Sequence, residues 1–244
     1  MSKVTKADFA RWYEMFSAPV SRFDCGRKCA PLNGGDPVCC STQNAVPVVD
    51  RPEWELLRSR TDLWHRFKPY DYATRQIVGE LSSGCLAIEC KGARHCERDN
   101  RSLGCRSFPF FPYLTREKEM AGLGVYWVFE DRCWLISNLQ VVDRAFIDEF
   151  FAVYEAIFAK DKEEFDTYVT FSASCRRVHS RWKRSFPILD RAGRILMVEP
   201  GTGRMRPRKA AEPPRFAPFT SEAAYARAVR EAGGTPPSRG LKPE

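Results

Sequence analysis

Residues 25–40 read CGRKCAPLNGGDPVCC, and they hold four cysteines among glycines, prolines and polar side chains. Glycine, proline and asparagine favour turns, so the wider segment from residue 24 to residue 47 is predicted to be turn-rich. A segment of this kind cannot build a core from its own apolar side chains. Something else in the protein must therefore order it, and its cysteines are the side chains best suited to form such a link.

A second cysteine group has the spacing Cys85-x4-Cys90-x5-Cys96-x8-Cys105, so eight of the ten cysteines lie in one third of the 244-residue chain. The first residues, MSKVTKADFARWYEMF, have no uninterrupted apolar stretch and no small-residue cleavage site, which predicts a cytoplasmic location. In a reducing cytoplasm, clustered cysteines bind metal or act in redox chemistry more often than they form disulfides.

Thiolates are the ligands that select iron–sulfur clusters and zinc, so the two groups predict one metal centre that links distant segments. The predicted ligands are Cys25, Cys29, Cys39, Cys40, Cys90, Cys96 and Cys105. In an extended backbone Cys39 and Cys40 would point to opposite sides, which favours two metals or two edges of a polynuclear cluster. The paired C-x2-C knuckles of zinc ribbons are absent. The predicted cofactor is therefore an iron–sulfur cluster, with zinc as the alternative.

Other residues near the second group bear on this centre. Cys85 and His95 are further candidate ligands, and the sequence leaves both open. Arg101 and Arg106 are candidates for hydrogen bonds to sulfur. The aromatic side chains that follow form either core or a shield around the centre, and these are Phe108, Phe110, Phe111 and Tyr113. The two remaining cysteines, Cys133 and Cys175, are predicted to be ordinary core residues.

The remaining pattern predicts an α+β fold, in which an irregular, cysteine-rich, metal-organised half packs with β-hairpins and two or three helices. Apolar side chains recur at helical spacing in residues 6–17 and 143–158, and Asp143 is the predicted N-cap of the second helix. Hairpins are predicted over residues 124–137 and 187–198. Shorter helices are expected from Asp50, over residues 163–171, and over residues 221–231.

The sequence predicts a single metal-binding domain over residues 1–200, with the cysteine cluster at 24–114, and a Pro-rich basic tail, mostly flexible, over 201–244. The tail has nine Lys and Arg against four Glu, so it accounts for most of the net charge of +8. A basic excess in a tail is not a folded basic stripe, and nucleic acid is not favoured as a partner. No apolar run approaches the roughly 20 residues that would cross a membrane.

CGRKCAPLNGGDPVCC, together with CKGARHCERDNRSLGCRSFPFFPYL at residues 90–114, resembles the YkgJ-type cysteine-cluster family. That family has a zinc- or iron-chelating domain and is related to the flagellin lysine N-methylases. Its paired cysteines after an upstream pair fall at Cys25, Cys29, Cys39 and Cys40. Its middle cysteines match Cys90 and Cys96, and its late CRxFP element falls at residues 105–109. The resemblance covers residues 24–114 and implies metal binding there, without implying a particular reaction.

Three functions follow from these observations. The first is a metal-binding protein that acts in redox chemistry, sensing or metal handling. The second is a metal-dependent protein-lysine methylase-like enzyme, although no Gly-rich loop after a strand is present. The third is a structural-zinc scaffold that binds an unidentified protein partner through its tail. With three histidines and no paired-carboxylate arrangement, the sequence predicts no catalytic residue and leaves enzyme activity open.

Overall fold

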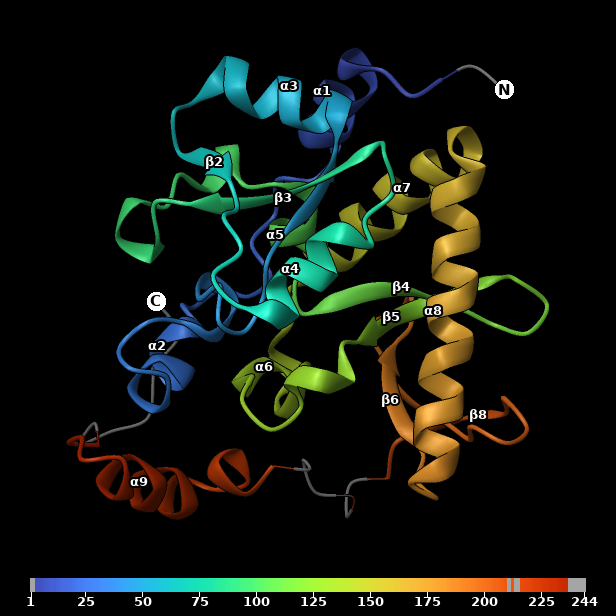
Figure 1. Ribbon diagram of the computed structural model, residues 1–244. Coiled ribbons are helices and arrows are strands. Elements are labelled where there is room, and N and C mark those ends of the chain that lie inside the picture. Colours follow the sequence, from blue (N-terminus) through green and yellow to red (C-terminus); the bar gives the residue numbers. More distant parts are fainter. Residues whose placement is uncertain (1–2, 210–211, 213–215, 237–244) are drawn as a thin grey trace.

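Two antiparallel sheets and the helices packed on them make an α+β fold, which confirms the predicted class (Figure 1). The structure is a computed structural model, and it describes residues 3–209, 212 and 216–236. None of the helices in these ranges is both long enough and apolar enough to cross a bilayer.

The small sheet carries part of the second cysteine group. Its strands are β1 (Val48–Asp50), β2 (Trp64–Arg66) and β3 (Cys85–Cys90), in the order β1-β3-β2. The central strand β3 begins at Cys85, which pairs with Asp50, and ends at Cys90, which pairs with Trp64. At about 3.4 Å of rise per residue, these two cysteines lie roughly 17 Å apart.

The large sheet has five strands in sequential order. They are β4 (Phe110–Leu114), β5 (Met120–Val125), β6 (Phe186–Leu189), β7 (Ile195–Val198) and β8 (Met205–Pro207). All of β4 is buried, and the ring of Phe111 lies against Gly124 of β5. A Cβ at Gly124 would come within 2.7 Å of that ring, so only glycine lets β4 and β5 pack this closely.

The longest helices cover the large sheet. α7 (Arg144–Lys160) begins after Asp143, whose side chain accepts a hydrogen bond from the Ala145 amide at 3.0 Å. α8 (Lys162–Arg181) lies across the strands in Figure 1. Ser172 of α8 accepts a hydrogen bond from the amide of Leu114 at 3.0 Å, which occupies a donor on the outer strand β4.

Shorter elements complete the chain. The remaining α-helices are α1 (Lys6–Met15), α2 (Gly26–Cys29), α3 (Arg51–Arg60), α4 (Tyr72–Gly79), α5 (Leu103–Ser107), α6 (Trp134–Ser137) and α9 (Glu222–Glu231). Single 3₁₀ turns are η1 (Ala30–Leu32), η2 (Val38–Cys40), η3 (Ala93–His95), η4 (Arg98–Asn100), η5 (Trp127–Phe129), η6 (Leu139–Val141) and η7 (Ala217–Phe219).

Most of the predicted elements are confirmed. The helices expected at residues 6–17, after Asp50, from Asp143 and at residues 221–231 are α1, α3, α7 and α9. The hairpin expected over residues 187–198 is β6–β7. The helix expected over residues 163–171 continues to Arg181, and there are more helices than the two or three predicted.

The predicted hairpin over residues 124–137 is wrong. Its first half belongs to β5, which pairs with the preceding strand β4 and with β6. After Val125 the chain forms helical turns instead of a strand. In one of them the amide of Cys133 donates a hydrogen bond to the carbonyl of Phe129 at 2.8 Å. The second half is helix α6, because both edges of β5 are already occupied and no place remains for another strand beside it.

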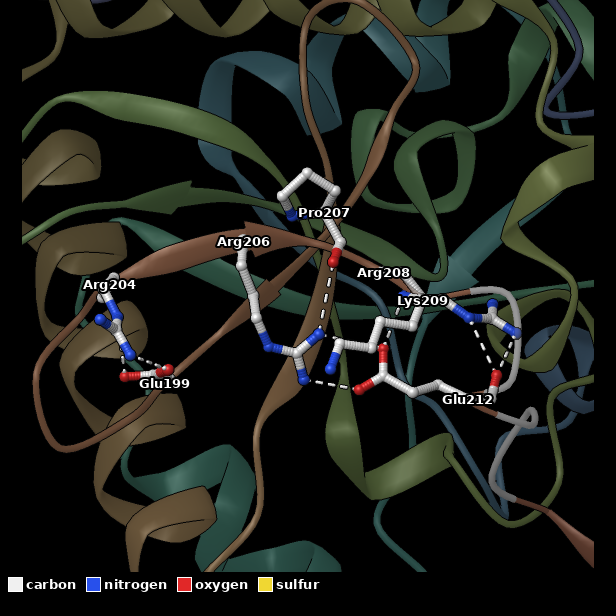
Figure 2. A network of polar contacts seen from close by, with 7 residues as sticks. All are labelled: Glu199, Arg204, Arg206, Pro207, Arg208, Lys209 and Glu212. Carbon is white, nitrogen blue, oxygen red and sulfur yellow. Dashed lines mark hydrogen bonds and ion pairs between the residues drawn. The ribbon is translucent and has the colours of Figure 1, made fainter.

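The strand β8 and the segment after it are held by ion pairs (Figure 2). Arg204 donates to Glu199 at 2.9 Å, and Arg206 donates to Glu212 at 2.5 Å. Arg208 donates to the carbonyl of Glu212 at 2.8 Å. Arg206 of β8 and the flanking Arg204 and Arg208 are therefore paired with acceptors from their own neighbourhood.

These contacts bear on the predicted tail. Residues 201–244 were expected to be mostly flexible, whereas β8 joins the large sheet and α9 is a helix with two buried side chains. Residues 210–211, 213–215 and 237–244 of the predicted tail lie outside the described residues. The domain boundary at residue 200 remains a prediction.

A buried carboxylate joins three helices of the cysteine-rich half. Glu53 of α3 is 4% exposed, and its Oε1 accepts from the Tyr13 hydroxyl and from the Leu103 amide, both at 2.7 Å. Leu103 begins α5, which carries Cys105. Burial raises the pKa of Glu53 to about 7.

Replacing Glu53 should therefore test this junction. Glu53→Leu leaves two buried donors without an acceptor and should lower the free energy of unfolding by about 2–5 kcal/mol. Glu53→Gln keeps the accepting oxygen and should stay within about 1 kcal/mol of wild type. Urea unfolding measures both, and the exposed Glu55→Leu on the same helix is the control.

The pH dependence gives a second measure of Glu53. Its pKa is raised from 4.5 to about 7 in the folded protein, so the folded state holds the proton more tightly than the unfolded state. Stability from this group is full below about pH 4.5 and is lost as the pH rises through about 7. Glu53→Gln should flatten this fall, and an unchanged pH profile would contradict the assignment.

Candidate metal centre

The first cysteine group is folded into two short turns that close on each other. Cys25 precedes α2 and Cys29 ends it, with the Cys29 thiol 3.6 Å from the carbonyl oxygen of Gly26. A Cβ at Gly26 would lie 2.8 Å from the side chain of Pro37. Because Pro37 directly precedes η2, this close approach brings α2 against the turn that carries Cys39 and Cys40.

The adjacent cysteines do not have the extended backbone expected from the sequence. Cys39 and Cys40 lie in the 3₁₀ turn η2, and their Sγ atoms are 3.9 Å apart. Two thiolates bound at about 2.3 Å to one tetrahedral zinc ion are roughly 3.8 Å apart. The expected extended backbone is therefore wrong, and this pair no longer favours two metals or two edges of a cluster over a single ion, because the helical turn places both thiols on the same side.

The second group comes from three different elements. Cys90 ends β3, Cys96 follows η3, and Cys105 lies in α5, where the Ser102 hydroxyl accepts a hydrogen bond from its amide at 3.2 Å. Nε of Arg101 donates to the sulfur of Cys96 at 3.2 Å. One of the two predicted donors to sulfur is thus placed beside a thiol.

Other residues near the second group have different surroundings. Arg106 donates to main-chain oxygens, including those of Tyr13 at 3.1 Å and Arg101 at 3.1 Å, so it fixes the backbone rather than a sulfur atom. Cys85 lies at the far end of β3, with its thiol 3.4 Å from Asp50 Oδ1. His95 is exposed.

Thiols from both groups influence one another electrostatically. Burial raises the pKa of Cys105 to about 12, and the charges of Cys90 and Cys40 add to this. Burial likewise raises the pKa of Cys90, with Cys40 and Cys96 adding to it. Burial also raises the pKa of Cys29, and Cys40 adds there too. Charge on Cys40 thus raises the pKa of thiols from residues 25–40 and from residues 90–105.

The centre contains one thiol that ionises easily and one cation. The hydrogen bond from Cys39 lowers the pKa of Cys40 to about 7, and Arg101 contributes in the same direction. Burial opposes the charge on Arg101, but Cys96 and Cys105 raise its pKa above the ordinary value. The guanidinium is therefore placed to balance thiolate charge from both groups.

Cys133 belongs to the main core, which confirms its predicted role, but it also lies near the first cysteine group, which the sequence did not indicate. It precedes α6, which packs against α2, and only 7% of its surface is exposed. Burial raises the pKa of Cys133 and the charges of Cys25 and Cys29 add to this, so it lies beside the first group. The mistaken hairpin assigned this cysteine to a strand, and no spacing in the sequence links it to the others.

Cys175 and the aromatic run belong to the core. Cys175 is 1% exposed and packs with Phe111, Tyr113 and Phe186, which confirms its predicted role. Phe110 is fully buried in the main core, and Cys105 packs against that same cluster. Core packing, rather than a shield around the thiols, accounts for these rings of β4.

The thiols share a neighbourhood without forming a closed ligand set. Within the described residues, no three His, Cys, Asp or Glu side chains are placed so that they could hold a metal ion as they stand. Comparison of this chain with protein-family models, curated proteins and solved structures finds no match. The seven ligands and the family resemblance remain predictions, which the donor chemistry fits.

The pH dependence of Cys40 alkylation should test the contact between the Cys39 and Cys40 thiols. In reduced, metal-free protein, the rate at which iodoacetamide modifies Cys40 should rise with a midpoint near pH 7, because the thiolate is the reactive form. Cys39→Ala removes the hydrogen bond and should move this midpoint upward, toward about 8.5. Peptide mass spectrometry measures it, with Cys85→Ala as the control. An unchanged midpoint in Cys39→Ala would show that the two thiols do not interact.

Proposed function

We propose that this protein holds a thiolate-ligated metal centre formed by Cys25, Cys29, Cys39, Cys40, Cys90, Cys96 and Cys105, with Cys133 beside the first group. Arg101 supports the proposal because it relates the two cysteine groups. Its Nε donates to the Cys96 sulfur at 3.2 Å, and its charge also lowers the pKa of Cys40, whose sulfur lies 3.9 Å from that of Cys39. Unrelated core cysteines would not be expected to gather around one cation such as Arg101.

An iron–sulfur cluster is the first candidate for the bound group. The cysteines that gather here exceed the four thiolates of one structural zinc site, and iron–sulfur clusters are held by cysteine thiolates. A centre of this kind would serve redox chemistry, sensing or metal handling. The protein's own residues would supply the thiolates, and Arg101 would supply a hydrogen bond to Cys96.

Zinc is the second candidate, and one distance favours it. The 3.9 Å between the Sγ atoms of Cys39 and Cys40 is close to the separation of two thiolates on a single tetrahedral zinc ion. Zinc would act here by holding distant segments together, because a metal that links them contributes its binding free energy to folding.

Metal analysis of cysteine variants should test the proposal. Protein purified without oxygen should contain iron with inorganic sulfide and broad visible absorption, or zinc without colour. Cys29→Ser, Cys40→Ser, Cys96→Ser and Cys105→Ser should each bind metal at least about tenfold more weakly. Cys85→Ser is the matched control and should keep its metal, because Cys85 lies at the far end of β3. Wild-type protein without bound iron or zinc would rule out the proposed function.

The charge of Arg101 gives a separate test. Arg101→Gln should weaken metal binding by about 10- to 100-fold, the usual effect of losing a residue that contacts a ligand. Arg101→Lys keeps the charge and should fall between this variant and wild type. Arg98→Gln, on the exposed turn η4, is the control. Competition with a chelator measures the affinities, and equal affinity in Arg101→Gln would remove Arg101 from the centre.

A further inference from the structure

The helix α9 packs directly on the first cysteine group. Tyr225 and Val229 of α9 are 3% and 0% exposed, and they form one apolar cluster with Cys29 and Val38. Phe219, in the turn before the helix, completes this cluster. In Figure 1, α9 lies beside the segment that contains α2, although almost 200 residues separate them in the chain.

A buried lysine strengthens this contact. The side chain of Lys28, in α2, is 4% exposed, and its Nζ lies 3.3 Å from Glu222 Oε1. The same Nζ lies 4.6 Å from the centre of the Tyr225 ring, where the negative face of the ring attracts a cation. Lys28 therefore fixes the position of the Tyr225 ring. In the chain, Lys28 directly precedes Cys29.

The hydroxyl of Tyr225 has no hydrogen-bond partner among the described residues, although it is buried. A buried donor without an acceptor is costly, and tyrosines in such places usually find a partner. Tyr225 and Cys29 belong to the same buried cluster, so the ring that carries this hydroxyl packs near the Cys29 thiol. A neutral thiol is a weak acceptor, whereas a metal-bound thiolate carries negative charge and accepts strongly.

We propose that α9 forms the outer wall of the metal centre and that Tyr225 is a positioning residue, whose hydroxyl donates a hydrogen bond to the Cys29 sulfur when that sulfur is bound to metal. This inference rests on the proposed function. It gives residues 219–231 a role in the centre, where the sequence predicted a short helix in a mostly flexible tail and, in one alternative, an arm that binds a protein partner.

The contact couples metal binding to the docking of α9. A helix of ten residues is not stable alone in water, so α9 depends on the surface that residues 25–40 provide. Metal that orders this surface therefore stabilises α9, and docked α9 must in turn hold the metal more tightly by the same factor.

Tyr225→Phe tests the proposal because it keeps the ring and removes only the hydroxyl. Iron or zinc carried by the anaerobically purified protein should pass to excess EDTA about tenfold faster in this variant. Metal-free Tyr225→Phe should be as stable as metal-free wild type or more stable, because the unpaired donor is gone. Trypsin should cut at the exposed Arg227 and Arg230 more slowly in metal-loaded wild type than in metal-free wild type, and this protection should be smaller in Tyr225→Phe.

Tyr70→Phe, at a tyrosine that is 58% exposed, is the matched control and should behave as wild type in all three measurements. If wild type carries metal and Tyr225→Phe releases it at the wild-type rate, the role of Tyr225 is overturned while the metal centre stands. If trypsin cuts α9 equally fast with and without metal, the coupling is overturned. If wild type carries no metal, the proposed function itself fails.

Discussion

The turn that carries Cys25 to Cys40 cannot stabilise itself, and the rest of the cysteine-rich half is arranged to hold it. The close packing of Gly26 on Pro37 closes the turn, and α6 and α9 cover it from regions more than 90 residues further along the chain. Glu53 does the same for the second group, because its hydrogen bond to the Leu103 amide fixes the start of α5. The turn of the first group and the helix that carries Cys105 are thus held by contacts that involve no metal.

The protonation state of the thiols explains why these cysteines can lie in one region of the protein without destabilising it. Burial raises the pKa of Cys25 and of Cys105 to about 12, so these thiols are neutral at physiological pH and do not repel one another. Cys40 differs, because the hydrogen bond from Cys39 lowers its pKa to about 7 and the opposite charge of Arg101 contributes to this. Binding a divalent cation would require protons to leave the other thiols, so the affinity of such a centre should increase with pH. Arg101 lowers the cost of that step because it balances the thiolate charge that develops.

The sequence predicted the helices and strands whose apolar pattern is visible within the element itself. It missed the strands whose position depends on neighbouring strands that lie elsewhere in the chain. The face of α7 and the strands β6 and β7 follow simple periodicity, and both were predicted. The strand β4 reads FFPYL and is buried on both faces, so it has no alternation to detect. Its neighbour β5 contains Gly122 and Gly124, where a larger side chain would clash with Leu189 and Phe111. These close contacts join distant parts of the chain and cannot be seen in the sequence. The error in this hairpin also hid Cys133, whereas the seven predicted ligands needed only the spacing of cysteines.

The two sides of the cysteine cluster differ in their access to solvent. Cys29 is buried against α9 and Cys133 is buried in the main core, whereas Cys39 and Cys96 are exposed. Solvent exposure and hydrogen bonds to sulfur are the properties that set the potential and the reactivity of a thiolate-bound metal. A centre closed on one side and open on the other suits exchange with solvent, as sensing and metal handling require, better than long-lived isolation. Under the proposed function, the buried side would determine how firmly a metal is held, and this is the side on which Lys28 and Tyr225 lie.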